Sequence, residues 1–474
     1  MATYFIDLDG VFFRYGTMVP LPGAVLSVRH LLGENHQVVF TTMRRRRGNQ
    51  PRHLGLRATE KVLAGLGLSE ARLVGGLSSP RVVINDEGAV AVNHIRNAPL
   101  LYQELAEVRH EVLVEQIYHG LAAIAWVSWK YKIGEDADDY VQTMQVTQSL
   151  LDCGGFDHAD LVRRYRRKSG YAMNGKELPA AGVYALYPGQ ISKLLQSEDP
   201  LYLASDGVTD GAAMKVAGLA ALYHPDLADL VKTVDQVTRV THASGAARMS
   251  AVLIAVRFRQ ILLNEQPESV EQLLVRFNEA LAMLDIADRD RAFFRQRVDT
   301  AAELAREESD PHTLLMQLAQ AIGLEHLAWS TPITACFWSF RGTPDFKKWF
   351  RHQKEKRIRW HTRKHRRFPL PLIRHQINGQ TLREDVHQAD RAYLHKLGEL
   401  EGYEKCRAGT WRKSIDVDTF FSIAFSLVAT EQGIEGIRSE VAAAERLFGD
   451  DLKALAGTLA QTLVARRGQK TGVA

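Results

Sequence analysis

The chain has 474 residues, with ordinary proportions of apolar (46%) and charged (24%) residues. This length points to two or three domains, and this composition excludes a disordered or fibrous protein. Three cysteines far apart in sequence exclude a disulfide framework and a paired-cysteine zinc site. The N-terminal MATYFIDLDG lacks a signal-peptide pattern, and no apolar run approaches the roughly 20 residues that a membrane helix needs. We therefore expect a soluble, cytoplasmic protein.

The net charge of +5 is concentrated in one segment. Residues 351–367 hold nine Lys or Arg and one Glu, a net +8, so the rest of the chain carries −3. A charge run is often a solvated helix face. Here the density of cations and the interleaved tryptophan favour contact with a polyanion, either nucleic acid or a nucleotide-bearing substrate. The residues expected to make this contact are Arg357, Arg359, Trp360, Arg363, Lys364, Arg366 and Arg367.

The first hundred residues alternate between short apolar runs and helical stretches. The runs 3–6, 37–40 and 81–84 predict strands, and the segments 22–34 and 55–68 predict helices between them. Short buried strands joined by helices indicate a parallel sheet with right-handed crossovers. Chemistry in such sheets gathers at the carboxyl ends of the strands.

Polar side chains follow each of these predicted strands. Asp7 and Asp9 follow the first, Thr41 and Thr42 the second, and Asp86 the third. The first carboxylate can attack a phosphorus centre while the second gives and takes a proton. Asp86 could complete a magnesium site with Asp7 and the backbone of residue 9.

These residues carry a resemblance to the haloacid dehalogenase-like phosphatases, through FIDLDGV, PLPGA, VVFTTMR and VVINDEG. The resemblance implies an uncapped α/β domain over residues 1–100 with one Mg²⁺, held by Asp7, Asp9 and Asp86. Asp7 would be the nucleophile, Asp9 the general acid/base and Thr42 the phosphate contact. A lysine expected before the third strand is absent, so Arg44 or Arg81 would bind phosphate. A retained fold without turnover is the alternative.

The rest of the chain, residues 101–474, predicts a larger all-α domain. Apolar residues recur at helical spacing over 113–124, 141–151 and 246–264, and the regions 268–330 and 434–466 are also helical in pattern. A basic insertion near 341–400 interrupts this pattern.

Two pairs of acids stand beside apolar helical stretches of this domain. Asp138 and Asp139 form the first pair, and Asp416 and Asp418 the second, followed by Thr419. Either pair alone is explained by the preference of acids for helix N-termini. Together, four carboxylates and a hydroxyl could hold two divalent cations.

The order of these acids and of TDGAAMK, VTHASGA and DVDT resembles the ADP-ribosylglycohydrolase family. The resemblance implies two Mg²⁺ ions in an all-helical fold that cleaves a bond to ADP-ribose. The implied metal ligands are Asp138, Asp139, Asp416, Asp418 and Thr419. The implied ADP-ribose contacts are Asp210, Gly211, Ala212, Met214 and His242, although His242 could equally be a hydrogen-bonded core residue.

Departures from the family pattern leave two functions open. Ala137 and Tyr140 stand where the family has threonines, and Lys215 replaces an arginine. The leading hypothesis is a bifunctional, magnesium-dependent hydrolase that removes a phosphate and cleaves an ADP-ribosyl linkage, on a nucleic-acid or nucleotide-bearing substrate. The alternative is a phosphatase whose helical domain only binds ADP-ribose or nucleic acid.

Overall fold

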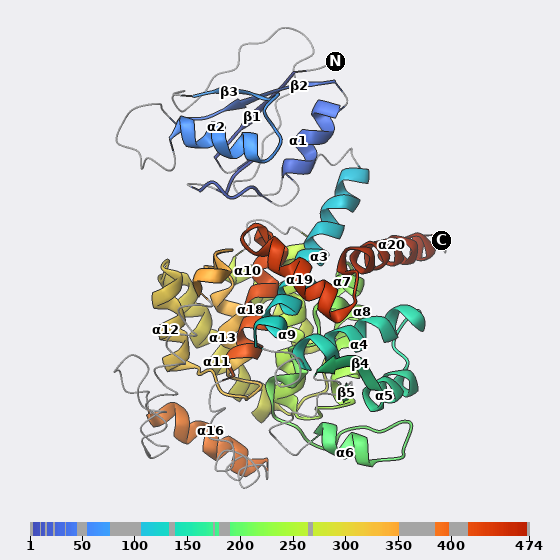
Figure 1. Ribbon diagram of the computed structural model, residues 1–474. Coiled ribbons are helices and arrows are strands. Elements are labelled where there is room, and N and C mark those ends of the chain that lie inside the picture. The colour runs from blue at the N-terminus through green and yellow to red at the C-terminus, as the bar shows by residue number, and fades with distance from the viewer. Residues whose placement is uncertain are drawn as a thin grey trace. The chain divides into compact units, whose positions relative to one another are not determined.

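A computed structural model describes most of the chain, and Figure 1 shows its elements. The described residues are 3–9, 11–14, 17–21, 24–33, 35–44, 55–75, 106–131, 138–173, 176–179, 190–263, 269–349, 384–397 and 416–471. The predicted strand 81–84, Arg81, Asp86, Ala137 and the basic segment 351–367 lie outside them. The chain divides into two compact units. The first comprises residues 1–116 with 264–268 and 431–433, and the second comprises the remainder.

The first unit contains a parallel sheet in the order β1-β2-β3. Strands β1 (Thr3–Asp7) and β2 (Gln37–Thr41) confirm two predicted strands, and helices α1 (Ala24–Gly33) and α2 (Leu56–Gly65) confirm the predicted helices. The third strand, β3 (Arg72–Val74), was not predicted. It has only three residues, too few for a pattern of alternation to be recognised.

One face of this sheet packs on helices, whereas the opposite face holds both the buried Val39 and the exposed Phe5 in the described residues. Side chains alternate along a strand, so Ile6, Val38 and Phe40 share the face that packs on α1 and α2. Right-handed crossovers between strands in sequential order bring both helices to that face. Phe5, on the opposite face, is 70% exposed.

The second unit is mostly helical, as predicted (Figure 1). The helices are α3 (Ala106–Tyr131), α4 (Asp138–Asp152), α5 (His158–Arg166), α6 (Gln190–Gln196), α7 (Ala217–Tyr223), α8 (Leu227–Arg239), α9 (Gly245–Leu263), α10 (Val270–Ala282), α11 (Asp288–Glu307), α12 (Pro311–Ala321), α13 (Thr331–Trp338), α16 (Glu384–Lys396), α18 (Val417–Gln432), α19 (Arg438–Phe448) and α20 (Leu452–Thr471), with the 3₁₀ turns η2 (Asp210–Ala212) and η4 (Glu435–Ile437). Most of α3 and most of α18 belong to this unit, and the others of these helices lie in it entirely.

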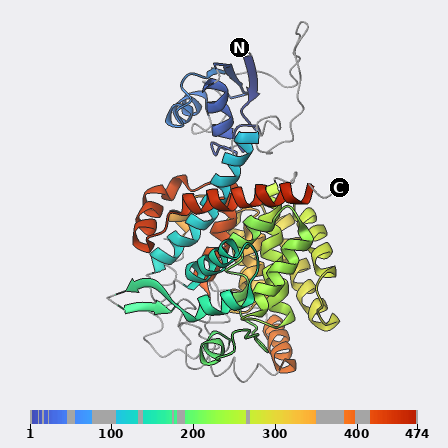
Figure 2. The ribbon, with the colours of Figure 1, turned by 90° about the vertical axis from the view of Figure 1, so that its right-hand side faces the viewer.

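Helix α9 is the centre of this unit. Its residues are buried all round, as expected of a helix that is apolar on every face, and it packs against α7, α8, α10, α11 and α13. Distant parts of the chain also meet: the C-terminal helix α20 (red in Figure 2) packs on α7, from the middle of the sequence.

The prediction of an all-α domain needs one correction. The second unit contains an antiparallel hairpin of β4 (Lys168–Met173) and β5 (Lys176–Pro179). The basic run 163–168 leads into this hairpin, and its Arg164 pairs with Asp160 and Asp152.

Among the described residues, no helix is long and apolar enough to cross a membrane.

Candidate functional site

Three buried carboxylates converge in the helical unit from distant parts of the sequence. Asp139 lies in the first turn of α4, Asp210 begins η2, and Asp416 directly precedes α18. They are 0%, 3% and 5% exposed. Each stands at the start of a helical segment, where unpaired backbone N–H groups favour negative charge.

Hydroxyl groups from α18 hold Asp139. Thr419 Oγ1 donates to Asp139 Oδ1 at 3.2 Å, and Ser422 Oγ donates to Oδ2 at 2.9 Å. The backbone N–H of Thr419 also donates to Asp416 Oδ1 at 3.3 Å. The two predicted acidic pairs therefore meet across α4 and α18, although 280 residues separate Thr419 from Asp139.

Asp416 is also held by a histidine from a third segment. His326 Nδ1 contacts Asp416 Oδ2 from the loop between α12 and α13. Two hydroxyls fix this loop, since Thr331 donates to the Glu325 carbonyl and Thr334 to the Gly323 carbonyl, both at 2.7 Å. Gly323 has a φ of +109°, a conformation that favours glycine.

The electrostatics of the cluster favour a bound cation. Burial raises the pKa of Asp139 and of Asp210, and the charge of neighbouring carboxylates raises both further. Burial also acts to raise the pKa of Asp416, but the charge and hydrogen bond of His326, together with hydrogen bonds from Asp418 and Asp210, lower that pKa overall. Asp210 Oδ2 is buried and accepts no hydrogen bond from a described donor. Such a site must take up either protons or a cation.

The residues present fit a divalent metal ion. One ligand atom from each of Asp210, His326 and Asp416 lies within 4.8 Å of the others. Buried carboxylate and hydroxyl oxygens suit Mg²⁺ or Ca²⁺, whereas a histidine nitrogen is typical of transition metals. Because its Nδ1 already contacts Asp416, His326 can serve as the partner that orients this ligand.

A loop of small residues lies beside the acids. Thr209 Oγ1 and His242 Nε2 are 2.8 Å apart. A Cβ on Gly211 would lie 3.3 Å from the same imidazole, so the close approach favours glycine at this position. The Thr143 hydroxyl of α4 lies 2.7 Å from the Asp139 carbonyl and 3.2 Å from the Met214 carbonyl, so the loop lies beside the helix that carries Asp139. His242 is thus buried with both ring nitrogens in hydrogen bonds.

The structure brings most of the sequence-predicted residues into this one region. Asp138 and Asp418, the other two predicted ligands, are half-buried beside it. Tyr140 turns away, since its hydroxyl donates to Asp450 Oδ2 at 2.6 Å and its ring packs on Phe448.

Sequence reasoning missed two residues of the site. Ser422 follows Thr419 by three residues, which is one turn along the same face of α18, and this spacing was the available signal. His326 had no such signal because it lies in a loop 90 residues from Asp416.

Comparison with known proteins identifies the family of this unit. The ADP-ribosylglycohydrolase family model matches residues 92–352, more than half of the chain. The chain therefore belongs to the ADP-ribosylglycohydrolase family.

Two further similarities concern parts of this ADP-ribosylglycohydrolase family chain. An uncharacterized protein of Archaeoglobus fulgidus is 28% identical over 166 residues, which are 33% of this chain and 52% of that protein. The chain thus spans about half the length of this curated relative. A solved structure described as an ADP-ribosylglycohydrolase-related protein complex aligns with a TM-score of 0.41 at 16% identity, covering 74% of this chain and 98% of the other.

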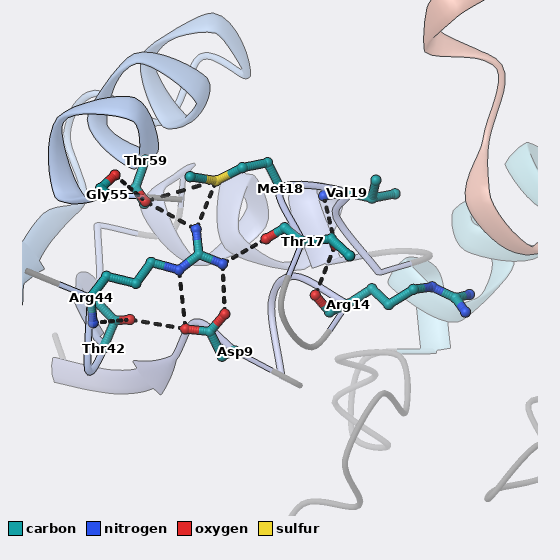
Figure 3. A network of polar contacts seen from close by, with 9 residues as sticks. All are labelled: Asp9, Arg14, Thr17, Met18, Val19, Thr42, Arg44, Gly55 and Thr59. Atoms are coloured by element: carbon teal, nitrogen blue, oxygen red, sulfur yellow. Dashed lines mark hydrogen bonds and ion pairs between the residues drawn. The ribbon is translucent and has the colours of Figure 1, made fainter. Parts of the chain in front are cut away.

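The family match begins at residue 92, so it leaves out the sheet of the first unit. At the carboxyl edge of that sheet lie Asp7, Asp9 and Thr42, as predicted. Asp7 ends β1 and is half-buried. Thr42 Oγ1 donates to Asp9 Oδ2 at 3.0 Å (Figure 3).

Arg44 binds the Asp9 carboxylate through two hydrogen bonds. Its Nε donates to Oδ2 at 3.1 Å and its Nη2 to Oδ1 at 2.6 Å. The remaining donors reach Thr59 Oγ1 at 3.0 Å and the Thr17 carbonyl at 2.6 Å (Figure 3). Arg44 is only 3% exposed. In this arrangement it neutralises Asp9 and holds the loop together, with its donors already engaged.

Proposed function

We propose that the helical unit is a magnesium-dependent hydrolase that cleaves the bond between the ribose of an ADP-ribosyl group and its acceptor. The observation that carries the proposal is the convergence of Asp139, Asp210 and Asp416, all buried, from three separate segments. Buried carboxylates that repel one another lower stability unless a ligand compensates them. Retaining such a cluster is therefore best explained by a bound cation.

Each residue of the cluster has a role in this proposal. Asp138, Asp139, Asp416, Asp418 and Thr419 would hold up to two ions. When bound, Mg²⁺ supplies positive charge that orients sugar hydroxyls and makes a water more acidic. Ser422 keeps the Asp139 carboxylate in place through its 2.9 Å hydrogen bond, and His326 does the same for Asp416.

The Thr209–Met214 loop would bind the ADP-ribosyl group. Thr209 and Gly211 are half-buried, whereas Asp210 and Ala212 are buried. A ligand would therefore contact Thr209 and Gly211. The absence of a side chain on Gly211 leaves its backbone open to close approach.

The test is release of ADP-ribose from an ADP-ribosylated peptide and from an ADP-ribosylated oligonucleotide, with Mg²⁺ and with a chelator. We expect Asp416→Asn to lower kcat/KM by at least about 100-fold, a loss of about 2.7 kcal/mol of transition-state stabilisation. Asp299→Asn is the matched control, because Asp299 is exposed on α11.

The outcome also separates the proposal from a purely binding function. If the wild-type protein binds ADP-ribose but releases none from either substrate, the helical unit is a binding module. Activity that survives both the chelator and Asp416→Asn would show that the acidic cluster is not the catalytic centre.

A second candidate function concerns the sheet unit. We propose that residues 1–100 form a haloacid dehalogenase-like phosphatase domain, followed by the hydrolase domain over 101–474. Asp7, Asp9 and Thr42 at one sheet edge support this function. Asp86, which lies outside the described residues, would complete a Mg²⁺ site with Asp7 and Asp9.

The Asp9–Arg44 pair sets the condition for turnover. Asp9 can act as general acid/base only when the Arg44 guanidinium leaves its carboxylate. Arg44 would then bind the substrate phosphate together with Arg81. A phosphate-ester assay on wild type and Asp7→Asn tests this function. Loss of phosphatase activity in Asp7→Asn supports it, whereas equal activity in the two proteins would show that Asp7 is not the nucleophile.

The basic segment 351–367 would add contact with nucleic acid. The chain re-enters the described structure as α16, which is anchored to the helical unit. Asp390 of α16 pairs with Arg297 and accepts from Trp329 Nε1 at 2.9 Å, and Tyr393 stacks on Phe293. These contacts hold α16, which follows the basic segment in sequence, on the helical unit.

A further inference from the structure

A chain of hydrogen bonds runs from a buried lysine to the ligand loop. Lys215 Nζ lies 2.6 Å from Thr241 Oγ1, Thr241 Oγ1 lies 2.8 Å from His242 Nδ1, and His242 Nε2 lies 2.8 Å from Thr209 Oγ1. Lys215 and Thr241 are fully buried, and Thr209 is half-buried. The chain therefore begins in the core and ends at the loop.

The chemistry of the first group sets the direction of every later bond. An ammonium group has three donors and no acceptor, so Lys215 donates to Thr241. The Thr241 hydroxyl hydrogen has no described acceptor other than His242 Nδ1, so we assign it to that nitrogen, which accepts. The neutral imidazole carries its proton on Nε2 and donates it to Thr209 Oγ1. Each link thus fixes the next.

The imidazole has the charge state that this direction requires. Burial lowers the pKa of His242 well below its usual value, and the positive charge of Lys215 lowers it further. His242 is therefore neutral near neutral pH, with one nitrogen that donates and one that accepts.

The last group of the chain has a hydrogen to offer. Thr209 stands at the N-cap of η2, yet its side chain makes no capping hydrogen bond. Its oxygen already accepts from His242, so its hydroxyl hydrogen points to another acceptor. Among described residues no acceptor is recorded for it.

We infer that Lys215 is a positioning residue: through Thr241 it fixes the Nε2–H tautomer of His242 and makes the Thr209 hydroxyl a donor to an acceptor oxygen of the ligand. The inference rests on the proposed function for the nature of that ligand. An anionic or hydroxyl oxygen of an ADP-ribosyl group is the acceptor that a hydroxyl donor suits.

The surroundings of Lys215 favour this role over a simple ion pair. Its other described hydrogen bond is to Gln142 Oε1 at 3.3 Å, and the ring of Tyr165 lies 5.4 Å from its nitrogen. The titratable groups that act on it or face it are Asp138, His242 and Tyr165. It forms no ion pair with a carboxylate in the described part of the chain.

The decisive measurement is the tautomer of His242, read from the ¹⁵N NMR shifts of its ring in the full-length protein. The signals are assigned by their loss in His242→Gln. At about pH 6, where the ammonium form predominates, the wild type should show the Nε2–H tautomer. Lys215→Met and Thr241→Val should both shift it toward Nδ1–H, because the first frees Thr241 to accept from Nδ1–H and the second removes the Thr241 donor. Lys232→Met, at an exposed lysine of α8, is the control.

The inference is overturned if Lys215→Met and Thr241→Val both keep the wild-type tautomer, or if the wild type shows Nδ1–H. Thr241→Val tests the chain without removing a charge, in case Lys215→Met does not fold.

Calorimetric titration with ADP-ribose then tests the last link. We expect Thr209→Val to bind about tenfold more weakly than wild type, the scale of one hydrogen bond to a charged group. Equal affinity would contradict donation to the ligand. Wild-type protein that shows the Lys215-dependent tautomer but binds no ADP-ribose would instead contradict the proposed function.

Discussion

Two buried cations, one in each unit, have different surroundings. In the sheet unit, the buried cation Arg44 is paired with the carboxylate of Asp9 through two hydrogen bonds. In the helical unit, the buried cation Lys215 and the buried acid Asp210 are five residues apart, yet Lys215 contacts neutral groups. A buried charge with a partner is compensated within the fold, whereas a buried charge kept apart from its opposite lowers stability.

The largest expected effect comes from Lys215, which has no carboxylate partner among the described residues. Burial lowers the pKa of Lys215 to about 7, against an ordinary value of about 10.4. The unfolded chain then binds more protons between these two values, so stability should rise with pH from about 7 to about 10. The contribution reaches about 4 kcal/mol, at about 1.4 kcal/mol per pKa unit. Urea unfolding of wild type and Lys215→Met across this range measures it, and parallel curves for the two proteins would show that Lys215 is not the cause.

Replacing Arg44, which is paired with Asp9, should lower the stability of the sheet unit. Arg44→Met leaves Asp9 without its cation, and breaking a buried pair in this way costs about 3 kcal/mol. Hydrogen exchange of the β1 and β2 amides reports on the sheet unit directly. Adding Asp9→Asn to Arg44→Met should restore part of the loss, because the uncompensated charge is removed. No recovery in the double variant would mean that Arg44 acts by packing alone.

A third expectation concerns the uncompensated acids. Mg²⁺ at about 100 times its dissociation constant should stabilise the folded protein by about 2.7 kcal/mol. Thermal unfolding with Mg²⁺ and with a chelator measures the difference. Asp139→Asn should reduce it strongly, whereas Asp299→Asn should not. The same stabilisation in all three proteins would place the metal elsewhere.

The smallest effect on stability is expected from the basic segment. Deleting 351–367 should leave the unfolding curve within about 0.5 kcal/mol of wild type, as is usual for surface changes. It should abolish most salt-sensitive binding to a single-stranded oligonucleotide, because phosphate contacts account for that dependence. Unchanged binding after the deletion would identify the segment as ordinary surface.

The sequence alone determined the local features of both units. Periodicity placed β1, β2, α1 and α2, and residue order pointed to the family and to Asp139, Asp210 and Asp416. These features depend on neighbours within a few residues, such as alternation along a strand or an acid at the first turn of a helix. The hairpin of β4 and β5 and the short β3 had too little pattern to be predicted.

Only the tertiary structure decided which side chains meet. It brought Ser422 to Asp139 and His326 to Asp416, engaged Arg44 with Asp9, and joined Lys215 to Thr209 through Thr241 and His242. No local pattern specifies such contacts, because they depend on how helices distant in sequence pack. Burial supplies the physical reason that they matter: away from water, each charge and hydroxyl must find a partner within the fold or in a ligand.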